Sequence, residues 1–570
     1  MAMSATITWE FNSGATANMV NGGGFKTGAT GVDYSTATAA HLTIADLQSD
    51  GADNTKVHSD LTPFDTNDIG NVLHITATGT GFTVGWYEVT AVDASTPPVA
   101  TLDRTCGGTS LTGGTAYLGG ALSLNSTLDS DFFQQLVAGQ KVYFKKGNYV
   151  LGEATSGVTT AGTTQLPISV IGYTSTRDDT CNDLNRPYIS TGAYGLQFYR
   201  RWQIKNLIVT STGTYGVGAD IASTLINIKA VNSAVLANYS AIEVFGTNGN
   251  IINCEGIAFN GRGIRSGGIT GVVVCSYAHH SDTGCSMGNP GSILNSVFAN
   301  NKTNGITTAG EKNCILNNTI YGSEGKIQTY GINIAANYHH SIQNNIIYGC
   351  ITGINATATD SQTYINYNDL YNNTTPVTNV TELSNDIAAD PLFTNAAGTL
   401  IEDCEDAWNE QVIANVTASL ETTIKKVGSG SAKFAITATF TTGVIGSEVI
   451  ASTNMSTYNG ISCWIYSDHD LAAGDLQLLL DDHANCVSPV LTYNFPGMSA
   501  TIWYWVYLCN LDMTSATAII SIGLKQNTDH DAAYNIYIDD VRGCNNDFSL
   551  GGASTCINTG LSYCKPAGTG

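Results

Sequence analysis

The sequence has few charged residues and few prolines, and it lacks long hydrophobic runs. Charged residues make up 12% of the 570 residues, and only 11 residues are proline. Disordered chains carry more charge and fewer aromatic residues, so a disordered protein is excluded. No stretch approaches the roughly 18 apolar residues of a membrane-spanning helix, and we expect no membrane insertion.

Basic residues are especially scarce. The chain has 23 Lys and Arg against 46 Asp and Glu, which gives a formal net charge of −23 and a pI near 4.6. Such a chain repels a phosphate backbone, so we expect no nucleic-acid partner. The same charge suits a soluble surface, or one that collects divalent cations.

Several catalytic and metal-binding motifs are absent. No C-x-x-C pair occurs among the 14 cysteines, which excludes the usual zinc ribbons and thioredoxin-type motifs. Many cysteines fall at apolar positions of alternating segments, which favours free, buried thiols over disulfides. No Walker loop, zincin motif or nucleophile elbow is present in its required context.

The N-terminal segment, MAMSATITWEFNSGATANMV, contains neither a basic segment nor an apolar run and does not predict a signal peptide. We therefore expect synthesis in a cytoplasm. A role outside the cell would then follow lysis or leaderless export.

What the sequence does contain is an internal repeat, which shows first in its glycines. A glycine followed by an apolar residue recurs at Gly263, Gly284, Gly305, Gly331 and Gly353. The spacings are 21, 21, 26 and 22 residues. Self-similarity at such a period is the mark of a repeat architecture.

An isoleucine series repeats in phase with the glycines. Ile293, Ile315, Ile342 and Ile365 are spaced 22, 27 and 23 residues apart, and both series lengthen at the same repeat. A leucine-rich repeat would need Leu at fixed positions, whereas these repeats use Ile, Val and Asn. We therefore predict a parallel β-helix, in which equivalent residues of successive coils stack about 4.8 Å apart.

The same phase predicts ladders of polar and aromatic side chains. Stacked asparagine amides and stacked rings stabilise coils that bury their faces only against their neighbours. We expect one column of Asn317 and Asn344, a second of Asn318, Asn345 and Asn368, and a third of Tyr321, Tyr348 and Tyr371.

The segment before the repeats predicts a cap for the β-helix. A short amphipathic helix is expected over 128–138, with Phe132, Phe133 and Leu136 on one apolar face that closes the open end. With the strands that follow, up to Tyr149, this stretch of about thirty residues resembles the corresponding segment of right-handed β-helix proteins such as pectate-lyase-like enzymes and phage tailspikes.

Two short sequence motifs resemble the two halves of a C-terminal motif that is common in right-handed β-helix repeat proteins. Asp390-Pro391-Leu392-Phe393 forms the first, and the second runs from Phe548 to Gly560. About 150 residues without the 21-residue period separate them. We interpret 399–545 as a domain inserted into the final coils, and 546–570 as the return to the cap and the C-terminal tail.

The inserted segment alternates between apolar and polar or aromatic residues, which predicts a β-sandwich. Its ends and its inner phrases, such as VGSGSAKFAI, resemble jelly rolls of carbohydrate-binding modules. That resemblance implies a structural Ca²⁺ held by Glu405 and Asp539, with acidic residues at strand ends as the alternative. Trp464, Trp503 and Trp505 are the candidates for stacking against sugar rings.

The expected fold class is all-β: a right-handed parallel β-helix over 119–398, the inserted jelly-roll sandwich, and an N-terminal β domain over 1–118. In that first domain, VNGGGFKTGATGVDYS resembles segments of phage structural proteins. A generic small β-domain that caps the solenoid is the alternative.

A catalytic site in a β-helix needs carboxylates in the same or neighbouring columns. Asp282, Lys302 and Glu324 are expected to share one, so the two carboxylates would lie two coils apart, about 10 Å. With Lys302 between them, a salt-bridge ladder is favoured over catalysis, and Asp282 and Glu324 remain candidates only. Arg262 and Arg265 could bind a sugar acid, but exposed charges are favoured.

The histidines give weaker evidence for a functional site. His279 falls in the column of Tyr321 and Tyr348, which favours a ladder position over a site. The loops SDHDL, DDHAN and TDHDA of the inserted segment place acidic residues beside histidines, where solvated loops are favoured over metal sites.

Three functions follow as hypotheses. The first is a phage virion structural protein (a spike, a fibre or a capsid decoration) on the virion surface, which contacts other virion proteins, binds cell-surface polysaccharide and forms a homotrimer. The second is a polysaccharide lyase or hydrolase, and the third a leaderless bacterial adhesin. The missing leader fits the virion protein best, because lysis releases virions, and the lack of a columnar acid pair weakens the enzyme. The sequence does not decide head or tail, or which glycan is bound.

Overall fold

The computed structural model describes residues 3–15, 19–51, 53–77, 81–124, 130–151, 159–179, 181, 185–193, 195–234, 239–288, 290–322, 328–335, 339–382, 385–409, 414–508, 513–551 and 554. The chain divides into two compact units. The N-terminal unit comprises 1–230 and 244–252, and the C-terminal unit comprises 231–243 and 253–570.

The N-terminal unit contains a closed antiparallel barrel with the strand order β3-β4-β7-β6-β5-β8. Its core is formed by alternating apolar side chains such as Ile44, Leu73 and Val89, all fully buried. The barrel strands are β3 (Leu42–Asp50), β4 (Asp53–His58), β5 (Val72–Ala77), β6 (Gly85–Asp93), β7 (Val99–Leu102) and β8 (Gly114–Leu118), with a 3-10 turn at Thr66–Asp68.

The first strand of the chain does not belong to this barrel. β1 (Ile7–Phe11) pairs antiparallel with β2 (Gly24–Lys26) and parallel with β9 (Lys141–Lys145). Residues 7–11 are therefore part of the first coil of the β-helix, so the predicted N-terminal domain of 1–118 is not one structural piece. Short-range patterning missed this because the pairing joins residues about 130 positions apart.

The predicted cap helix is present as α1 (Ser130–Gln135), although 128 and 129 lie outside the described residues. Phe132 and Phe133 are fully buried, and Leu136 is 3% exposed. Phe132 packs edge-on against Trp9, and Phe133 packs against Phe198 of the coils. The apolar face therefore covers the end of the coil core.

The coils of this unit are parallel, as predicted. The register is continuous from β9 through β11 to β14, with Val142 opposite Val170 and Val170 opposite Ile204. The strands are β9, β10 (Asn148–Val150), β11 (Ile168–Tyr173), β12 (Tyr188–Ser190), β13 (Leu196–Phe198), β14 (Trp202–Ser211), β15 (Tyr215–Ala219), β16 (Thr224–Asn232) and β18 (Asn250–Ile252).

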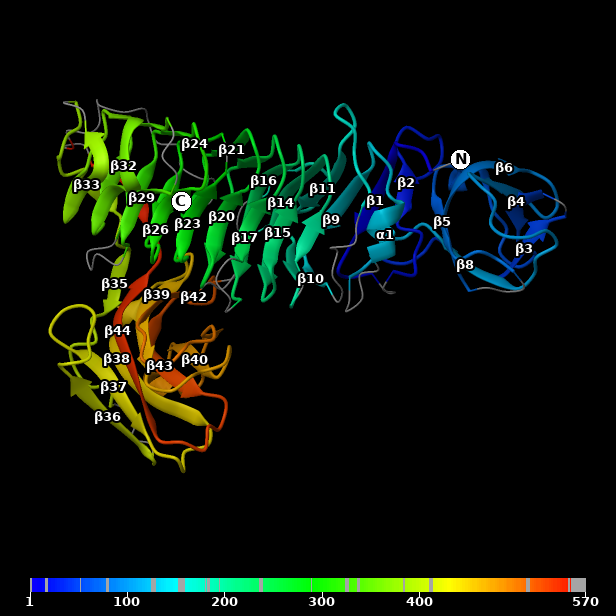
Figure 1. Ribbon diagram of the computed structural model, residues 1–570. Helices are drawn as coiled ribbons and strands as arrows, with labels where there is room; N and C mark the ends of the chain where they lie inside the picture. Colours follow the sequence, from blue (N-terminus) through cyan, green and yellow to red (C-terminus); the bar gives the residue numbers. More distant parts are fainter. Residues whose placement is uncertain are drawn as a thin grey trace. The chain divides into compact units, whose positions relative to one another are not determined.

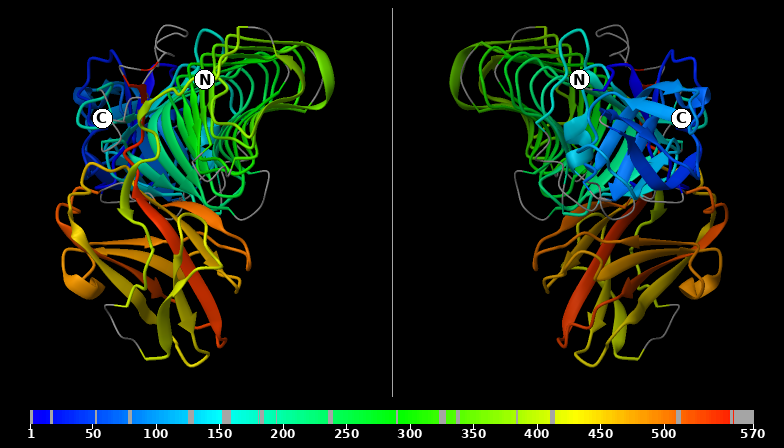
Figure 2. Two further views of the ribbon diagram at one scale, coloured as in Figure 1. Left: turned by 90° about the vertical axis from the view of Figure 1, so that its left-hand side faces the viewer. Right: turned by 90° about the vertical axis from the view of Figure 1, so that its right-hand side faces the viewer.

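The C-terminal unit is built from parallel coils of three strands each (Figure 1). Figure 2 looks along these coils. The isoleucine series forms one column, because Ile293 pairs with Ile315, Ile315 with Ile342, and Ile342 with Ile365. The strands are β17 (Ser240–Val244), β19 (Glu255–Ala258), β20 (Arg262–Ser266), β21 (Gly271–Val274), β22 (Tyr277–His279), β23 (Thr283–Met287), β24 (Gly291–Leu294), β25 (Val297–Ala299), β26 (Asn304–Thr308), β27 (Cys314–Leu316), β28 (Thr319–Tyr321), β29 (Tyr330–Ile334), β30 (Ser341–Gln343), β31 (Ile346–Tyr348), β32 (Thr352–Asn366) and β33 (Thr375–Glu382).

The glycine column has a steric cause. A Cβ atom at Gly284 would lie 2.5 Å from the carbonyl oxygen of Gly305, and one at Gly331 would lie 2.5 Å from that of Gly353. Because the backbone of each coil approaches the next so closely at this position, only glycine fits.

The two asparagine columns have different structural roles. The Asn345 amide donates to Asn368 Oδ1 at 2.9 Å and accepts from Asn318 Nδ2 at 3.0 Å, so the second predicted column is a hydrogen-bonded ladder. Asn317 and Asn344 instead have φ of 60° and 56°, a left-handed conformation that asparagine adopts more readily than most residues. The first column is therefore explained by the turn.

The two motifs, which are far apart in the sequence, lie next to each other in the structure. β34 (Phe393–Asn395) pairs antiparallel with β45 (Asp547–Leu550), and the Phe393 and Phe548 rings pack against Tyr321 of the tyrosine ladder. Tyr321 and Tyr348 themselves stack at 5.1 Å. The second motif beyond Ser554 lies outside the described residues.

Between these strands, two antiparallel sheets share one apolar core, as expected for a sandwich (Figures 1 and 2). The larger sheet has the order β36-β37-β44-β39-β42, with β35 added to β44, and the smaller has the order β38-β43-β40-β41. The strands are β35 (Thr399–Glu402), β36 (Val416–Glu421), β37 (Ser431–Ile436), β38 (Gly443–Thr453), β39 (Ile461–Ser467), β40 (Leu476–Asp481), β41 (Leu491–Asn494), β42 (Tyr504–Leu508), β43 (Ile519–Gln526) and β44 (Tyr534–Gly543), with a 3-10 turn at Ala484–Cys486.

Every cysteine that the structure describes is a free thiol, in agreement with the sequence. Burial raises the pKa of Cys350 to about 12, so this thiol stays protonated and behaves as a small apolar side chain. Within the described residues, no helix has the length and apolar character that a membrane crossing needs.

Candidate functional site

The larger sheet of the sandwich has an apolar inner face and an aromatic outer face. Along β39, Cys463 and Ile465 enter the core, while Trp464 and Tyr466 lie on the other face. Trp505 of β42 is directly opposite Trp464. The strand alternation thus places aromatic rings side by side on the outer face.

We name the resulting group the aromatic strip: Trp464, Tyr466, Trp503, Trp505 and Tyr537. Ring centroids are 5.0 Å apart for Trp464 and Trp505, 5.4 Å for Tyr466 and Trp503, and 5.3 Å for Tyr466 and Tyr537. The sequence singled out the three tryptophans and missed the two tyrosines, although the alternation of β39 and β44 already placed Tyr466 and Tyr537 on the same face.

The three predicted tryptophans differ in access. Trp464 is only 3% exposed, and the Lys426 ammonium lies 4.5 Å from its ring centroid. Trp503 and Trp505 are half-buried, and Trp505 stacks on His280 of the coil at 5.9 Å. Trp464 is therefore a buried member of the strip, whereas Trp503 and Tyr466 form its accessible part.

Asp539 of β44 is a buried carboxylate with one oxygen that the described residues leave unsatisfied. It is fully buried, its Oδ2 accepts from the backbone N–H groups of Lys426 and Val427, and its Oδ1 has no hydrogen-bond partner among the described residues. The pKa of Asp539 is raised to about 6, mainly by burial and to a smaller extent by the nearby carboxylates of Asp540 and Glu405. A hard cation at Oδ1 would relieve this desolvation.

Glu405 lies on the other side of the same loop. Its Oε1 accepts from the backbone N–H of Ser429 at 2.7 Å, and its Oε2 accepts from the Ser429 hydroxyl. Hydrogen bonds from Ser429 hold the pKa of Glu405 below its usual value. Glu405 and Asp539 thus both bind the loop that contains Lys426 and Ser429, and carboxylate oxygens are ligands of the kind that Ca²⁺ prefers.

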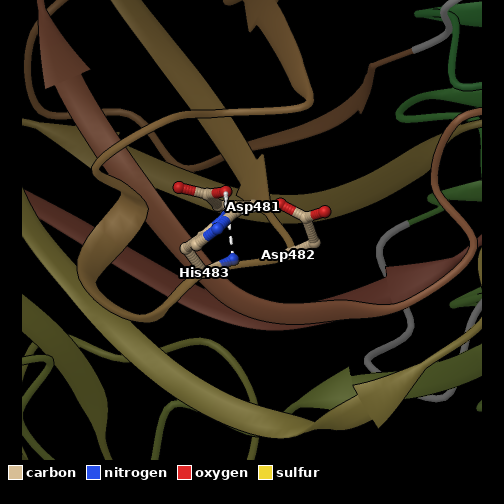
Figure 3. Close-up of side chains that lie close together, drawn as sticks. All are labelled: Asp481, Asp482 and His483. Atoms are coloured by element: carbon tan, nitrogen blue, oxygen red, sulfur yellow. Dashed lines mark hydrogen bonds and ion pairs between the residues drawn. The ribbon is translucent and has the colours of Figure 1, made fainter.

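A third acidic group is the cluster of Asp481, Asp482 and His483, shown in Figure 3. His483 Nδ1 lies 2.7 Å from Asp482 Oδ1 and 3.5 Å from Asp481 Oδ1. The buried Asp481 also accepts from the backbone N–H groups of His483 and Ser488. These bonds lie within the cluster and its own loop, and the solvated-loop interpretation stays a prediction.

Asp282 and Lys302 lie on adjacent coils, but they do not share a column as predicted. The register pairs Thr283 with Asn304 and therefore sets Asp282 level with Thr303. The expected salt-bridge ladder, however, is not formed between them. Asp282 accepts from the Thr303 hydroxyl at 2.6 Å, and Lys302 Nζ lies 5.7 Å from the Tyr504 ring. Glu324 lies outside the described residues.

A carboxylate that the sequence analysis missed lies nearby, on β17. The Glu243 side chain is 1% exposed, pairs with Arg265 at 2.6 Å and has no hydrogen-bond partner for its Oε2 among the described residues. Burial raises its pKa, and Arg265 opposes that rise. The signal was a glutamate inside the otherwise apolar strand SAIEV. Arg265 is thus an ion-pair partner, and Arg262 lies within electrostatic range of Glu243 and Asp282.

His279 takes the predicted ladder position. It pairs in register with Ala299, and Ala299 pairs with Tyr321. The alternating pattern did not reveal that the neighbouring His280 would pack against Trp505 and Tyr507 of the inserted sandwich.

Comparisons with known proteins find weak structural likeness alone. No protein-family model and no curated protein matches the chain. An exo-beta-agarase shares 16% identity over 26% of this chain and 24% of that chain, with a TM-score of 0.18, so the match spans about a quarter of that protein. Pectate lyase Pel9A shares 15% identity over 47% of this chain and 77% of that chain, with a TM-score of 0.28. The tailspike protein gp49 of Acinetobacter baumannii bacteriophage Fri1, a capsular polysaccharide depolymerase, shares 10% identity over 82% and 93%, with a TM-score of 0.29. The parallel fold of this chain rests on its own strand pairing.

Proposed function

We propose that this chain is a polysaccharide-binding attachment protein of a phage particle, of the spike or fibre type. The observation that carries the proposal is the aromatic strip. The ring centroids of Tyr466 and Trp503 lie 5.4 Å apart, and both side chains are partly exposed on the outer face of the larger sheet. Aromatic rings present large apolar surfaces with a polar edge, which suits the apolar faces of sugar rings.

The β-helix supplies the support for this site. Parallel coils locked by the isoleucine column and the Asn345 ladder form a rigid scaffold for the sandwich that is inserted at their end. The setting on a virion rests on the sequence resemblance to phage tailspikes. Contacts with other virion proteins and trimer formation are further parts of the proposal, and a trimer would multiply weak sugar contacts.

The test uses the full chain with purified capsule or lipopolysaccharide and follows both binding and the release of reducing ends or unsaturated products. Retention of polysaccharide without product supports attachment. Antibody labelling of phage particles in a lysate tests the virion setting separately. The absence of label on the particles would contradict the virion setting and would not bear on glycan binding.

A polysaccharide lyase or hydrolase is the second candidate, and Glu243 is the observation that favours it. A buried carboxylate whose pKa is raised can serve as a general acid. Sustained product release that is lost in Glu243→Gln, or in the earlier candidate Asp282→Ala, would establish catalysis. Equal release by wild type and both variants would place the chemistry elsewhere.

We further propose that Glu405 and Asp539 hold a structural Ca²⁺. The ion would supply charge compensation for the buried Asp539 and would fix the loop at Ser429. It would therefore contribute to the stability of the sandwich rather than to catalysis.

A further inference from the structure

The outer face of the larger sheet also contacts the coils. There, Trp505 and Tyr507 of β42 pack against two consecutive histidines, His279 and His280. The His280 ring is stacked on Tyr507 at 5.0 Å and on Trp505 at 5.9 Å, and His279 meets Tyr507 edge-on at 4.9 Å. We name this contact the histidine latch.

The two imidazoles are joined directly to each other. His279 Nδ1 lies 2.7 Å from His280 Nδ1, and His279 Nε2 lies 3.1 Å from Glu255 Oε1. Such an Nδ1 pair needs one donor and one acceptor. His280 is 5% exposed, and its Nε2 has no partner among the described residues.

This geometry limits how many protons the pair can hold. One added proton can reside on His279, where the Glu255 carboxylate balances its charge. A second proton gives His280 a charge with no acceptor at Nε2, and it turns both Nδ1–H groups toward each other. A buried, unpaired charge of this kind is strongly unfavourable.

Among the other titratable groups, Glu255 offsets that charge only in part: burial and the neighbouring His279 lower the pKa of His280 by more than the Glu255 carboxylate raises it. A small open cavity adjoins the pair, and its titratable lining consists of Glu255, Tyr277 and His279 from the coils with Tyr507 and Cys544 from the sandwich. Of these, only Glu255 carries a negative charge near neutral pH, and it is already paired with His279.

We propose that the histidine latch is an acid-sensitive contact, in which protonation of His280 releases the sandwich from the coils. Separation would expose His280 to water and return its pKa toward 6.5, whereas burial in the contact lowers that pKa. A group whose pKa is lowered in the bound state stabilises that state fully above its free value. The contact is therefore complete above pH 6.5 and weakens as the pH falls below it, by up to about tenfold per pH unit for one proton.

The experiment is hydroxyl-radical footprinting of the full chain between pH 7.5 and 5.0, read by mass spectrometry. Tyr507 is the reporter, because it is 9% exposed in the contact, and Trp408, fully buried in the sandwich core, is the internal reference. We expect labelling of Tyr507 to rise severalfold below pH 6.5 while labelling of Trp408 stays constant. His280→Gln, which cannot be protonated, should remove the pH response, whereas His483→Gln, at an exposed position of the sandwich, should keep it.

Constant Tyr507 labelling in the wild type from pH 7.5 to 5.0 would overturn the proposal, as would an unchanged response in His280→Gln. A simultaneous rise at Trp408 would show unfolding of the sandwich and would also overturn it. If His280→Gln does not fold, His280→Phe keeps the ring stacking and replaces it. The outcome does not depend on whether the aromatic strip binds a glycan.

Discussion

Phe393 and Phe548 pack edge to face, with ring centroids 5.9 Å apart, although the whole sandwich lies between them in sequence. The same closure continues inside the insertion, where Thr399 of β35 pairs with Gly543 of β44. The chain therefore leaves and re-enters the coils at one place, and the two ends of the sandwich are held together by its own strands.

From this closure we predict that residues 399–545 fold as an isolated segment. The segment contains its complete apolar core and joins its own ends, so it should unfold in one cooperative transition. Circular dichroism during heating would check this. A chain that is soluble but shows no transition would contradict the prediction.

Calcium should raise the melting temperature of that segment. A ligand that binds only the native state at about 100 times its dissociation constant contributes about 2.7 kcal/mol of stability. Asp539→Ala or Glu405→Ala should abolish the rise, while Asp482→Ala, in the internally bonded acidic cluster, should retain it. Melting curves with CaCl₂ and with a chelator provide the measurement. The absence of any shift in the wild type would remove the metal site.

Gly331→Ala should destabilise the β-helix by about 1–3 kcal/mol, because the new Cβ would lie 2.5 Å from both the Gly353 oxygen and the Ile347 side chain. Gly108→Ala is the matched control, since its Cβ would make an ordinary contact at 3.6 Å with Leu111. Urea denaturation of both variants would test the difference. Equal stabilities would show that the coils relax around the methyl group.

Trp503→Ala should weaken polysaccharide binding by about 0.5–1.5 kcal/mol, roughly two- to tenfold, if one sugar ring stacks on the accessible part of the strip. Tyr364→Ala removes an aromatic ring that is 44% exposed on the coils and should leave binding unchanged. Isothermal titration with the same polysaccharide would compare them. A loss in both variants, or in neither, would argue against the strip as the binding surface.

The sequence by itself determined the parallel β-helix, its register and the presence of an inserted β segment. Coils repeat a local pattern, so Gly331, Ile342 and Asn345 report their stacking neighbours directly through their spacing. Periodicity is sufficient wherever each repeat contacts only the next.

Tertiary structure alone decided the remaining features. Strand β1 joins the first coil, Glu243 is buried against Arg265, and His280 is enclosed by Trp505 and Tyr507. These contacts connect segments with no common period, and a side chain's burial there depends on which distant surface covers it. Alternation placed Trp464 and Trp503 on one face, but only the packing of Lys426 and the neighbouring rings made the first buried and left the second accessible.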